Sequence, residues 1–129
     1  MKSRIAIAIA VAGGFALGAA TIEGLHAQAK APVFTVAEID VSNVDAYNKE
    51  YAPKAQALIR SKGGKVLAGS NNVVALEGQP AKRLAIHQWE SMEKAKAWHG
   101  SKEYKELRKT AGDKYAKFRI LAAEGLPPQ

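Results

Sequence analysis

KRLAIHQWESMEKAKAW, residues 82–98, passes from a strand pattern to a helix pattern at one polar boundary. Its first half alternates between two faces, one carrying Leu84, Ile86 and Gln88 and the other carrying Ala85, His87 and Trp89. That alternation predicts a strand over residues 82–89. Ser91 is a good helix N-cap and Gly100 a good helix stop, so a helix is expected between them.

The chain beyond Gly100 predicts one more helix and one more strand. Ser101 can cap the helix, whose inward face carries Tyr104, Leu107 and Ala111, and Gly112 is expected to end it. Residues 115–124 centre on FRILA and predict the last strand.

The part before residue 82 begins with the same kind of pattern. VFTVAEIDV, residues 33–41, predicts a strand whose later half alternates apolar residues with Glu38 and Asp40. Ser42 or Asn43 can cap a helix with one apolar face, made by Val44, Tyr47, Tyr51, Ala55 and Leu58. Pro53 is expected to kink or split that helix, and Gly63-Gly64 to end it.

Residues 65–68 and 72–77 are two short strand-like runs around Gly69-Ser70-Asn71. They form either one bent strand or a tight hairpin. The predicted order is therefore β-α-β-β-α-β, an α+β protein of the ferredoxin-like type, with an antiparallel sheet and helices on one face. Apolar residues on the other face predict a second subunit against it, as in a homodimer.

The N-terminus has the pattern of a secretory signal peptide. Lys2 and Arg4 precede an uncharged apolar stretch, and Ala27-Gln28-Ala29 fits a signal peptidase site. We expect residues 1–29 to be a signal peptide cut after Ala29, and residues 30–129 a single periplasmic or secreted domain. The alternative is an uncleaved anchor, although the apolar stretch falls short of the roughly 20 residues that span a bilayer.

Composition limits the functions open to residues 30–129. Without Lys2, Arg4 and Glu23, the 19 basic and 12 acidic residues of the whole chain leave a net charge of +6. The basic residues alternate with acids along the predicted helices, so a nucleic-acid surface is not expected, nor a membrane span in the mature chain. The chain has no cysteine, and no HxH or HExxH spacing, so we expect no metal site and no cofactor.

Six segments together resemble the bacterial domain-of-unknown-function family 1330 (DUF 1330). They are AEIDV at 37–41, Tyr47 with Tyr51, GGKVL at 63–67, VALEG at 74–78, WESMEKAKAW at 89–98 and SKEY at 101–104. The resemblance covers residues 33–125. It implies a dimeric α+β barrel, a superfamily whose members include cofactor-free monooxygenases, lactone isomerases and haem-handling enzymes. The family has no agreed catalytic set to carry over, and Trp89-Glu90 departs from the Phe-Pro that members commonly show.

His87 is the best single candidate for chemistry, because its pKa suits proton transfer. If the first and third strands are neighbours, Glu38 or Asp40 could lie beside it and orient the imidazole. The alternatives are a histidine satisfied by hydrogen bonds and carboxylates paired with Arg83 or Arg119.

Aromatic side chains on the inward faces predict a pocket, or simply a core. They are Tyr47, Tyr51, Trp89, Trp98 and Tyr104. The sequence therefore favours a homodimer that binds a small apolar or aromatic molecule, and leaves open whether it is an enzyme. If it is one, acid/base, isomerase-like or monooxygenase-like chemistry would use His87 as the base and Tyr51 as a donor; the alternative is a non-catalytic envelope module.

Overall fold

The computed structural model describes residues 31–128, of which Ala31–Pro127 form one compact unit. Four strands are present: β1 (Val33–Val41), β2 (Lys65–Ser70), β3 (Arg83–Trp89) and β4 (Ala116–Glu124). The first helical crossover consists of α2 (Val44–Ala46), the π-helical turn η1 (Tyr47–Tyr51) and α3 (Ala52–Ser61). The second consists of α4 (Met92–His99), α5 (Lys102–Leu107), the π-helical turn η2 (Arg108–Gly112) and α6 (Asp113–Tyr115).

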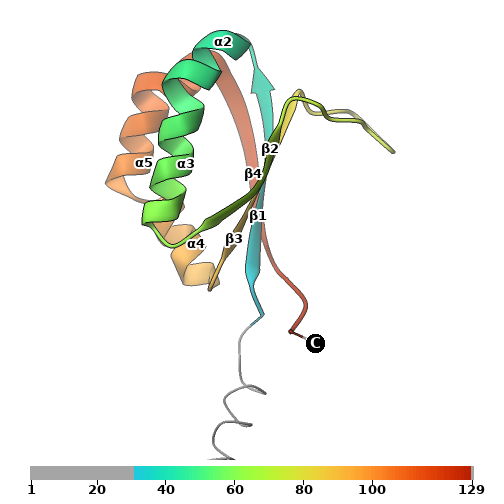
Figure 1. Ribbon diagram of the computed structural model, residues 1–129, viewed down its shortest axis with the longest axis vertical. Coiled ribbons are helices and arrows are strands. Elements are labelled where there is room, and N and C mark those ends of the chain that lie inside the picture. Colours follow the sequence, from blue (N-terminus) through green and yellow to red (C-terminus); the bar gives the residue numbers. More distant parts are fainter. Residues whose placement is uncertain (1–30, 129) are drawn as a thin grey trace, which may run out of the picture. The chain divides into compact units, whose positions relative to one another are not determined.

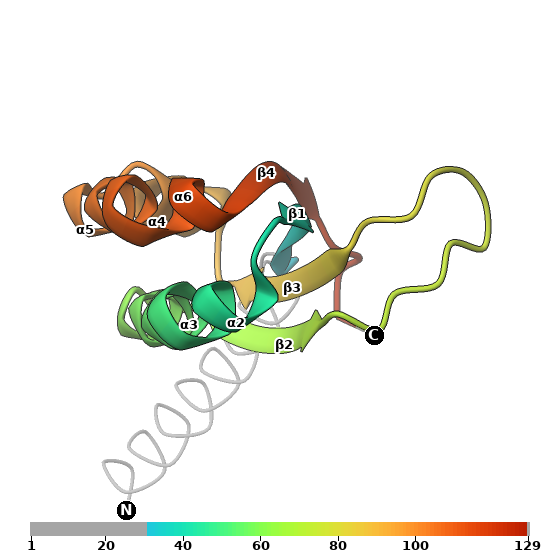
Figure 2. The same ribbon diagram turned by 90° about the horizontal axis from the view of Figure 1, so that it is seen from above.

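The strands form one antiparallel sheet in the order β2-β3-β1-β4. Both crossovers lie on the same side of this sheet, as Figures 1 and 2 show. This arrangement confirms the predicted α+β, ferredoxin-like β-α-β-β-α-β fold. The sheet therefore has an inner face under the helices and an outer face without them.

Pro53 does not split the first helix, because the helix continues from Val44 through a π turn to Ser61. Ala52 donates its backbone N–H to the carbonyl of Tyr47, five residues back, and this bond closes the π turn. Pro53 then stands in the first turn of α3, where its missing N–H costs least. The extra residue in the turn directs both Tyr47 and Tyr51 toward the sheet, where both are buried.

The second crossover starts as predicted and ends later. The side chains of Ser91 and Ser101 accept the backbone N–H groups of Lys94 and Tyr104, so both serve as caps. The predicted stop at Gly112 is wrong, because the helix continues through η2 and α6 to Tyr115. A Cβ on Gly112 would lie 2.7 Å from Cε2 of Tyr51, so glycine lets η2 approach the ring at this point.

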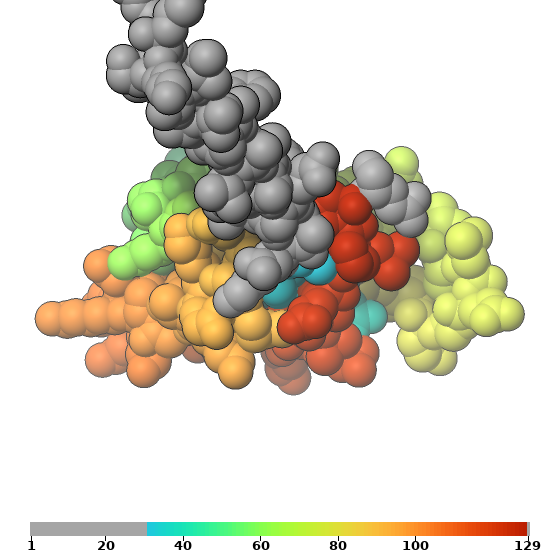
Figure 3. All heavy atoms as spheres, turned by 90° about the horizontal axis from the view of Figure 1, so that it is seen from below, coloured from blue at the N-terminus to red at the C-terminus, as the bar shows by residue number. Residues whose placement is uncertain are grey.

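The strand predicted at residues 72–77 is also wrong. Residues 71–82 form an irregular loop, with Val74 75% and Leu76 93% exposed. Strand β3 pairs with β2 on one side and β1 on the other, and residues 71–82 add no strand at either edge of the sheet. The loop extends away from the helices, and stands apart from them in the space-filling view (Figures 2 and 3).

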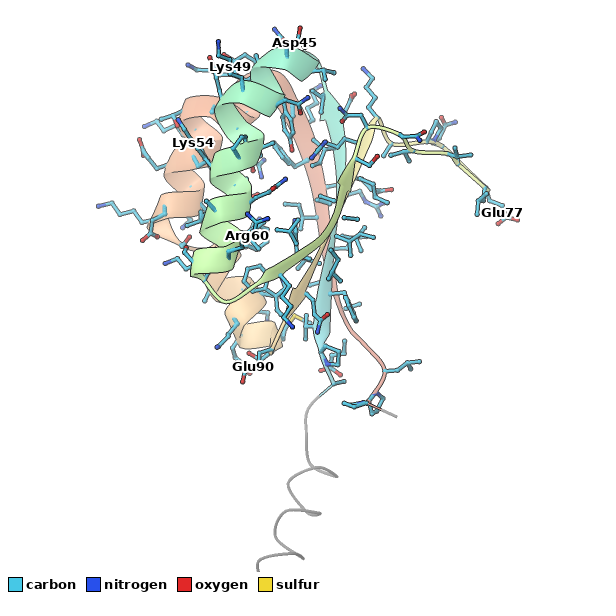
Figure 4. The ribbon with its side chains drawn as sticks, in the orientation of Figure 1. Asp45, Lys49, Lys54, Arg60, Glu77 and Glu90 are labelled. Atoms are coloured by element: carbon cyan, nitrogen blue, oxygen red, sulfur yellow. The ribbon has the colours of Figure 1, made fainter. Side chains whose placement is uncertain are left out.

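The core lies between the inner face and the helices. Alternate residues of β1 and β3 are buried there. In β3 they include Ala85, His87 and Trp89, which confirms that these three share one face. Gly64 contributes by its small size, because a Cβ there would lie 2.7 Å from Ile59 and 2.8 Å from Trp89. Charged residues of the first crossover, including Lys49 and Lys54, point away from the sheet (Figure 4).

Candidate functional site

A cavity of about 40 Å³ lies between the inner face of the sheet and the helices. Its volume exceeds the roughly 10–15 Å³ that one water needs. The walls are mostly apolar and aromatic, with few polar groups. They consist of Ala37, Ile39, Tyr47, Tyr51, Ala52, Ala55, Gln56, Ile59, Val66, Ala68, Gly69, Arg83, Ala85, His87, Trp98, Tyr104, Phe118 and Ile120.

Small residues at facing positions leave this space. Ala37 and Ala85 are paired across the two central strands, so the floor of the cavity has only methyl groups at its centre. Ala52 and Ala55 of α3 also line it. Because a close-packed interior normally interdigitates large and small side chains, four alanines together create room.

Two buried hydrogen bonds, which meet at the hydroxyl of Thr35, fix the position of the His87 ring. Thr35 lies opposite His87 in the paired strands, and its Oγ1 is 2.9 Å from the Nδ1 atom of His87. Trp89 donates its Nε1–H to the same Oγ1 at 3.0 Å. His87 and Thr35 are 5% and 2% exposed, so water does not compete for these bonds.

These two hydrogen bonds assign the tautomer of His87. The indole of Trp89 can only donate, so it occupies a lone pair of Thr35 and leaves the threonine proton free to donate. The acceptor that the structure offers to that proton is Nδ1 of His87. A neutral imidazole that accepts at Nδ1 carries its proton on Nε2. His87 is therefore a hydrogen-bond donor at Nε2.

Burial also keeps His87 neutral. Removal from water disfavours the charged imidazolium and lowers the pKa of His87 to about 4. Desolvation is the cause, and no carboxylate offsets it. At neutral pH the side chain is an uncharged donor.

Arg83 carries a buried positive charge at the start of β3, on the same face of the strand as His87. It is 7% exposed, and its guanidinium lies 5.3 Å from the ring centre of Tyr47. Its Nη1 donates to Oδ1 of Asn71 at 3.1 Å, while Nε is buried without a partner. None of the carboxylates in residues 31–128 forms an ion pair with it.

Arg108, near the other wall, is fully partnered by contrast. It donates from Nε to Asp113 at 2.7 Å and from Nη1 to the hydroxyl of Tyr104 at 2.8 Å. Its guanidinium also lies 3.8 Å from the ring centre of Phe118.

Burial raises the pKa of Tyr51 well above its usual range, and the neighbouring Tyr104 adds to the rise. Tyr51 therefore stays a neutral phenol.

The predicted carboxylates do not meet His87. Glu38 and Asp40 belong to the other set of alternate positions in β1 and lie on the outer face. Glu38 accepts from Arg119 at 2.6 Å, as one of the alternatives proposed, and Asp40 pairs with Lys82 at 3.1 Å. The prediction that a carboxylate orients His87 is therefore wrong, and Thr35 is the residue that bonds its Nδ1.

Four of the five predicted pocket aromatics line the cavity: Tyr47, Tyr51, Trp98 and Tyr104. Trp89 does not; it is 1% exposed and packs behind His87, with its ring centre 5.1 Å from that of Trp98. Thr35 and Arg83 were missed as site residues. A signal for Arg83 was present, because it shares the alternation of Ala85 and His87.

Neither a metal cluster nor a membrane span is found in the described part of the chain. No group of three or more His, Asp or Glu side chains there could hold a metal ion. No helix within residues 31–128 is long and apolar enough to cross a bilayer.

Comparison with known proteins gives a family and a fold. The family model described as "Domain of unknown function (DUF1330)" matches residues 32–126. No curated protein sequence matches the chain. Among solved structures, the protein of unknown function RPA0582 from Rhodopseudomonas palustris is 15% identical, with a TM-score of 0.59 over 84% of this chain and 94% of that one. A "putative antibiotic biosynthesis monooxygenase" from Nitrosomonas europaea is 15% identical, with a TM-score of 0.53 over 77% and 94%.

Proposed function

Since this chain belongs to the DUF1330 family, whose description names no activity, we propose its function from the cavity: it binds a small apolar or aromatic organic molecule. The observation that carries this proposal is an apolar, aromatic-walled space into which few polar side chains project. Small-molecule sites have this composition. His87, held in one tautomer from behind, supplies a directed hydrogen bond.

Any chemistry at this site would use His87 as a donor. An Nε2–H that stays neutral can polarise a ligand oxygen, as neutral imidazoles do in some enzymes. The base role expected for His87 has no support here, because its Nδ1 lone pair is engaged by Thr35. If the chemistry were monooxygenation, the activity in the name of the Nitrosomonas neighbour, His87 would take part in it as a hydrogen-bond donor.

Binding can be tested by filling the cavity. The purified protein would be screened by thermal shift and ligand-detected NMR against small aromatic acids, amides, lactones and quinones. We expect a ligand that raises the melting temperature of the wild type and not that of Ala85→Leu. Ala97→Leu, on the exposed side of α4, is the matched control and should bind normally. A flat screen, or equal binding by Ala85→Leu, would contradict the proposal.

The outer sheet face supports a homodimer. Apolar side chains from three strands gather there, including the half-buried Val36 and Ile86 and the 51% exposed Leu121. The loop 71–82, with Val74 and Leu76 exposed, reaches out on that same side (Figure 2). Contiguous exposed apolar surface indicates an interaction site. If the cavity binds nothing, these features favour the second candidate, a non-catalytic interaction module.

We also propose export. Residues 1–29 lie outside the described residues, so their sequence pattern is the support. In a bacterial host, intact mass spectrometry of the periplasmic fraction should find a chain that begins at Lys30. A full-length chain retained in the membrane fraction would indicate an anchor instead.

A further inference from the structure

The unpaired polar atoms around the cavity are donors. Nε of Arg83 and Nε1 of Trp98 are the buried side-chain nitrogen and oxygen atoms without a partner in the described residues, and both side chains line the cavity. Nε2 of His87, which carries the proton in the tautomer assigned above, adds a third donor on the cavity wall. Buried donors are normally paired, so the missing partner is an acceptor.

The charge of the missing partner follows from Arg83. A buried cation is costly unless an anion compensates it, and Arg83 forms no ion pair with the described carboxylates. Glu38 and Asp40, the carboxylates closest along β1, are paired with Arg119 and Lys82 on the outer face. Asn71 and the ring and hydroxyl of Tyr47 contact the guanidinium but bring no negative charge.

The lining residues also define the kind of anion. Arg83 is the one charged side chain among the described residues around the cavity, so it can neutralise one negative charge. The rest of the wall, centred on Ala37 and Ala85, is apolar and offers nothing to a phosphate's remaining oxygens. A planar carboxylate fits a guanidinium through two parallel hydrogen bonds.

We infer that the cavity binds a small organic monocarboxylate, with its carboxylate on Arg83 and its apolar body extending over Ala85 toward Trp98 and His87. This inference rests on the proposed function and names the ligand class of the same site. Arg83 and His87 are four residues apart on β3, which spans roughly 13 Å of strand. A ligand held at Arg83 extends along the strand in the direction of His87.

The test compares matched charged and neutral probes by isothermal titration calorimetry at pH 7.5. Benzoate and hexanoate would be titrated against benzamide and hexanamide. We expect each carboxylate to bind the wild type at least about tenfold more tightly than its amide, the size of effect that a charge-assisted bond gives. Arg83→Gln should remove this preference for the acid over the amide, whereas Arg119→Gln, on the outer face, should keep it.

The outcomes separate the two proposals. Equal binding of acid and amide to the wild type overturns the carboxylate inference and leaves the proposed function standing. No binding of any probe overturns both. Inorganic phosphate binding as tightly as benzoate would mean an anion site without selectivity for organic ligands, which also overturns it.

Two further measurements keep the inference testable if Arg83→Gln fails to fold. The comparison of acid with amide needs only the wild type. Ala85→Leu keeps Arg83 and fills the space beside it, so it should lose benzoate binding while Ala97→Leu retains it. Unchanged benzoate binding by Ala85→Leu would place the carboxylate elsewhere and contradict the inference.

Discussion

Thr35 and His87 face each other across the two central strands, with Oγ1 2.9 Å from Nδ1. The threonine hydroxyl also accepts the indole N–H of Trp89 at 3.0 Å. One small side chain therefore fixes the orientation of an imidazole and satisfies a buried tryptophan. Both partners depend on a residue that does not itself line the cavity.

Replacing this hydroxyl should destabilise the protein and free the imidazole. Thr35→Val leaves Nδ1 of His87 and Nε1 of Trp89 without partners, and each buried unpaired group costs about 1–3 kcal/mol. We expect a loss of at least about 2 kcal/mol in urea unfolding. Nitrogen NMR of the imidazole should show a pure Nε2–H tautomer in the wild type and a mixture in the variant.

Thr110→Val is the matched control, because Thr110 is exposed and bonds only a helix carbonyl. It should change the stability by less than about 0.5 kcal/mol. A wild-type spectrum with the proton on Nδ1 would contradict the tautomer assignment.

The lowered pKa of His87 makes stability depend on pH in one direction. The pKa is about 4 in the folded protein against 6.5 in the unfolded chain. Between these values the unfolded chain binds a proton that the folded protein does not, so stability falls as pH drops through this window. The full difference corresponds to roughly 3 kcal/mol.

Urea unfolding of wild type and His87→Gln at pH 7.5, 6 and 5 measures this contribution. Carboxylates titrate in both proteins, so the difference between the two slopes reports His87. We expect the variant to lose less stability on acidification than the wild type. Parallel curves would mean that His87 titrates normally in the folded protein.

A charge on the outer face should separate the subunits of the proposed dimer. Leu121 is opposite Val36 in the β1–β4 pair, near the middle of that face. Leu121→Asp would bury a carboxylate against apolar residues of the partner, so we expect a monomer by size-exclusion chromatography with light scattering.

Val44→Asp makes the same change at the start of α2, where Val44 is 45% exposed, and should remain a dimer. A wild type that runs as a monomer at the same concentration would contradict the dimer outright.

Gly64 should tolerate no side chain. Alanine there would place a methyl group within 2.7 Å of Ile59 and 2.8 Å of Trp89, and overpacking of a core costs about 1–3 kcal/mol. Gly100→Ala is a milder comparison, because its nearest contact is a helix carbonyl at 3.2 Å. Equal melting temperatures for the two variants would contradict the close packing described at Trp89.

The sequence predicted the strands and caps well, because alternation and polar boundaries are local signals. The bounds of β1 and the caps Ser91 and Ser101 agree with the structure. The strand predicted at residues 72–77 was wrong, because strand propensity alone does not determine whether a segment pairs with the edge of a sheet. The π turns could not be predicted, since they depend on how Tyr51 and Gly112 pack.

The candidate site was predicted in part. Alternation placed His87 on one face with Ala85 and Trp89, and the same reasoning applied to β1 separates Glu38 and Asp40 from Ala37 and Ile39. Combining the two patterns would have put the carboxylates on the opposite face from His87. The aromatic residues predicted either a pocket or a core. That a cavity remains between them, and that Nε of Arg83 is unpaired, depends on three-dimensional packing.

The register of the sheet also has a consequence for how the chain folds. Val33 begins β1 and lies opposite Glu124, which ends β4. One edge of β1 therefore stays unpaired until β4 has been synthesised, so the nascent chain cannot complete its sheet until synthesis is almost finished. Contacts between residues so far apart in the sequence also form slowly.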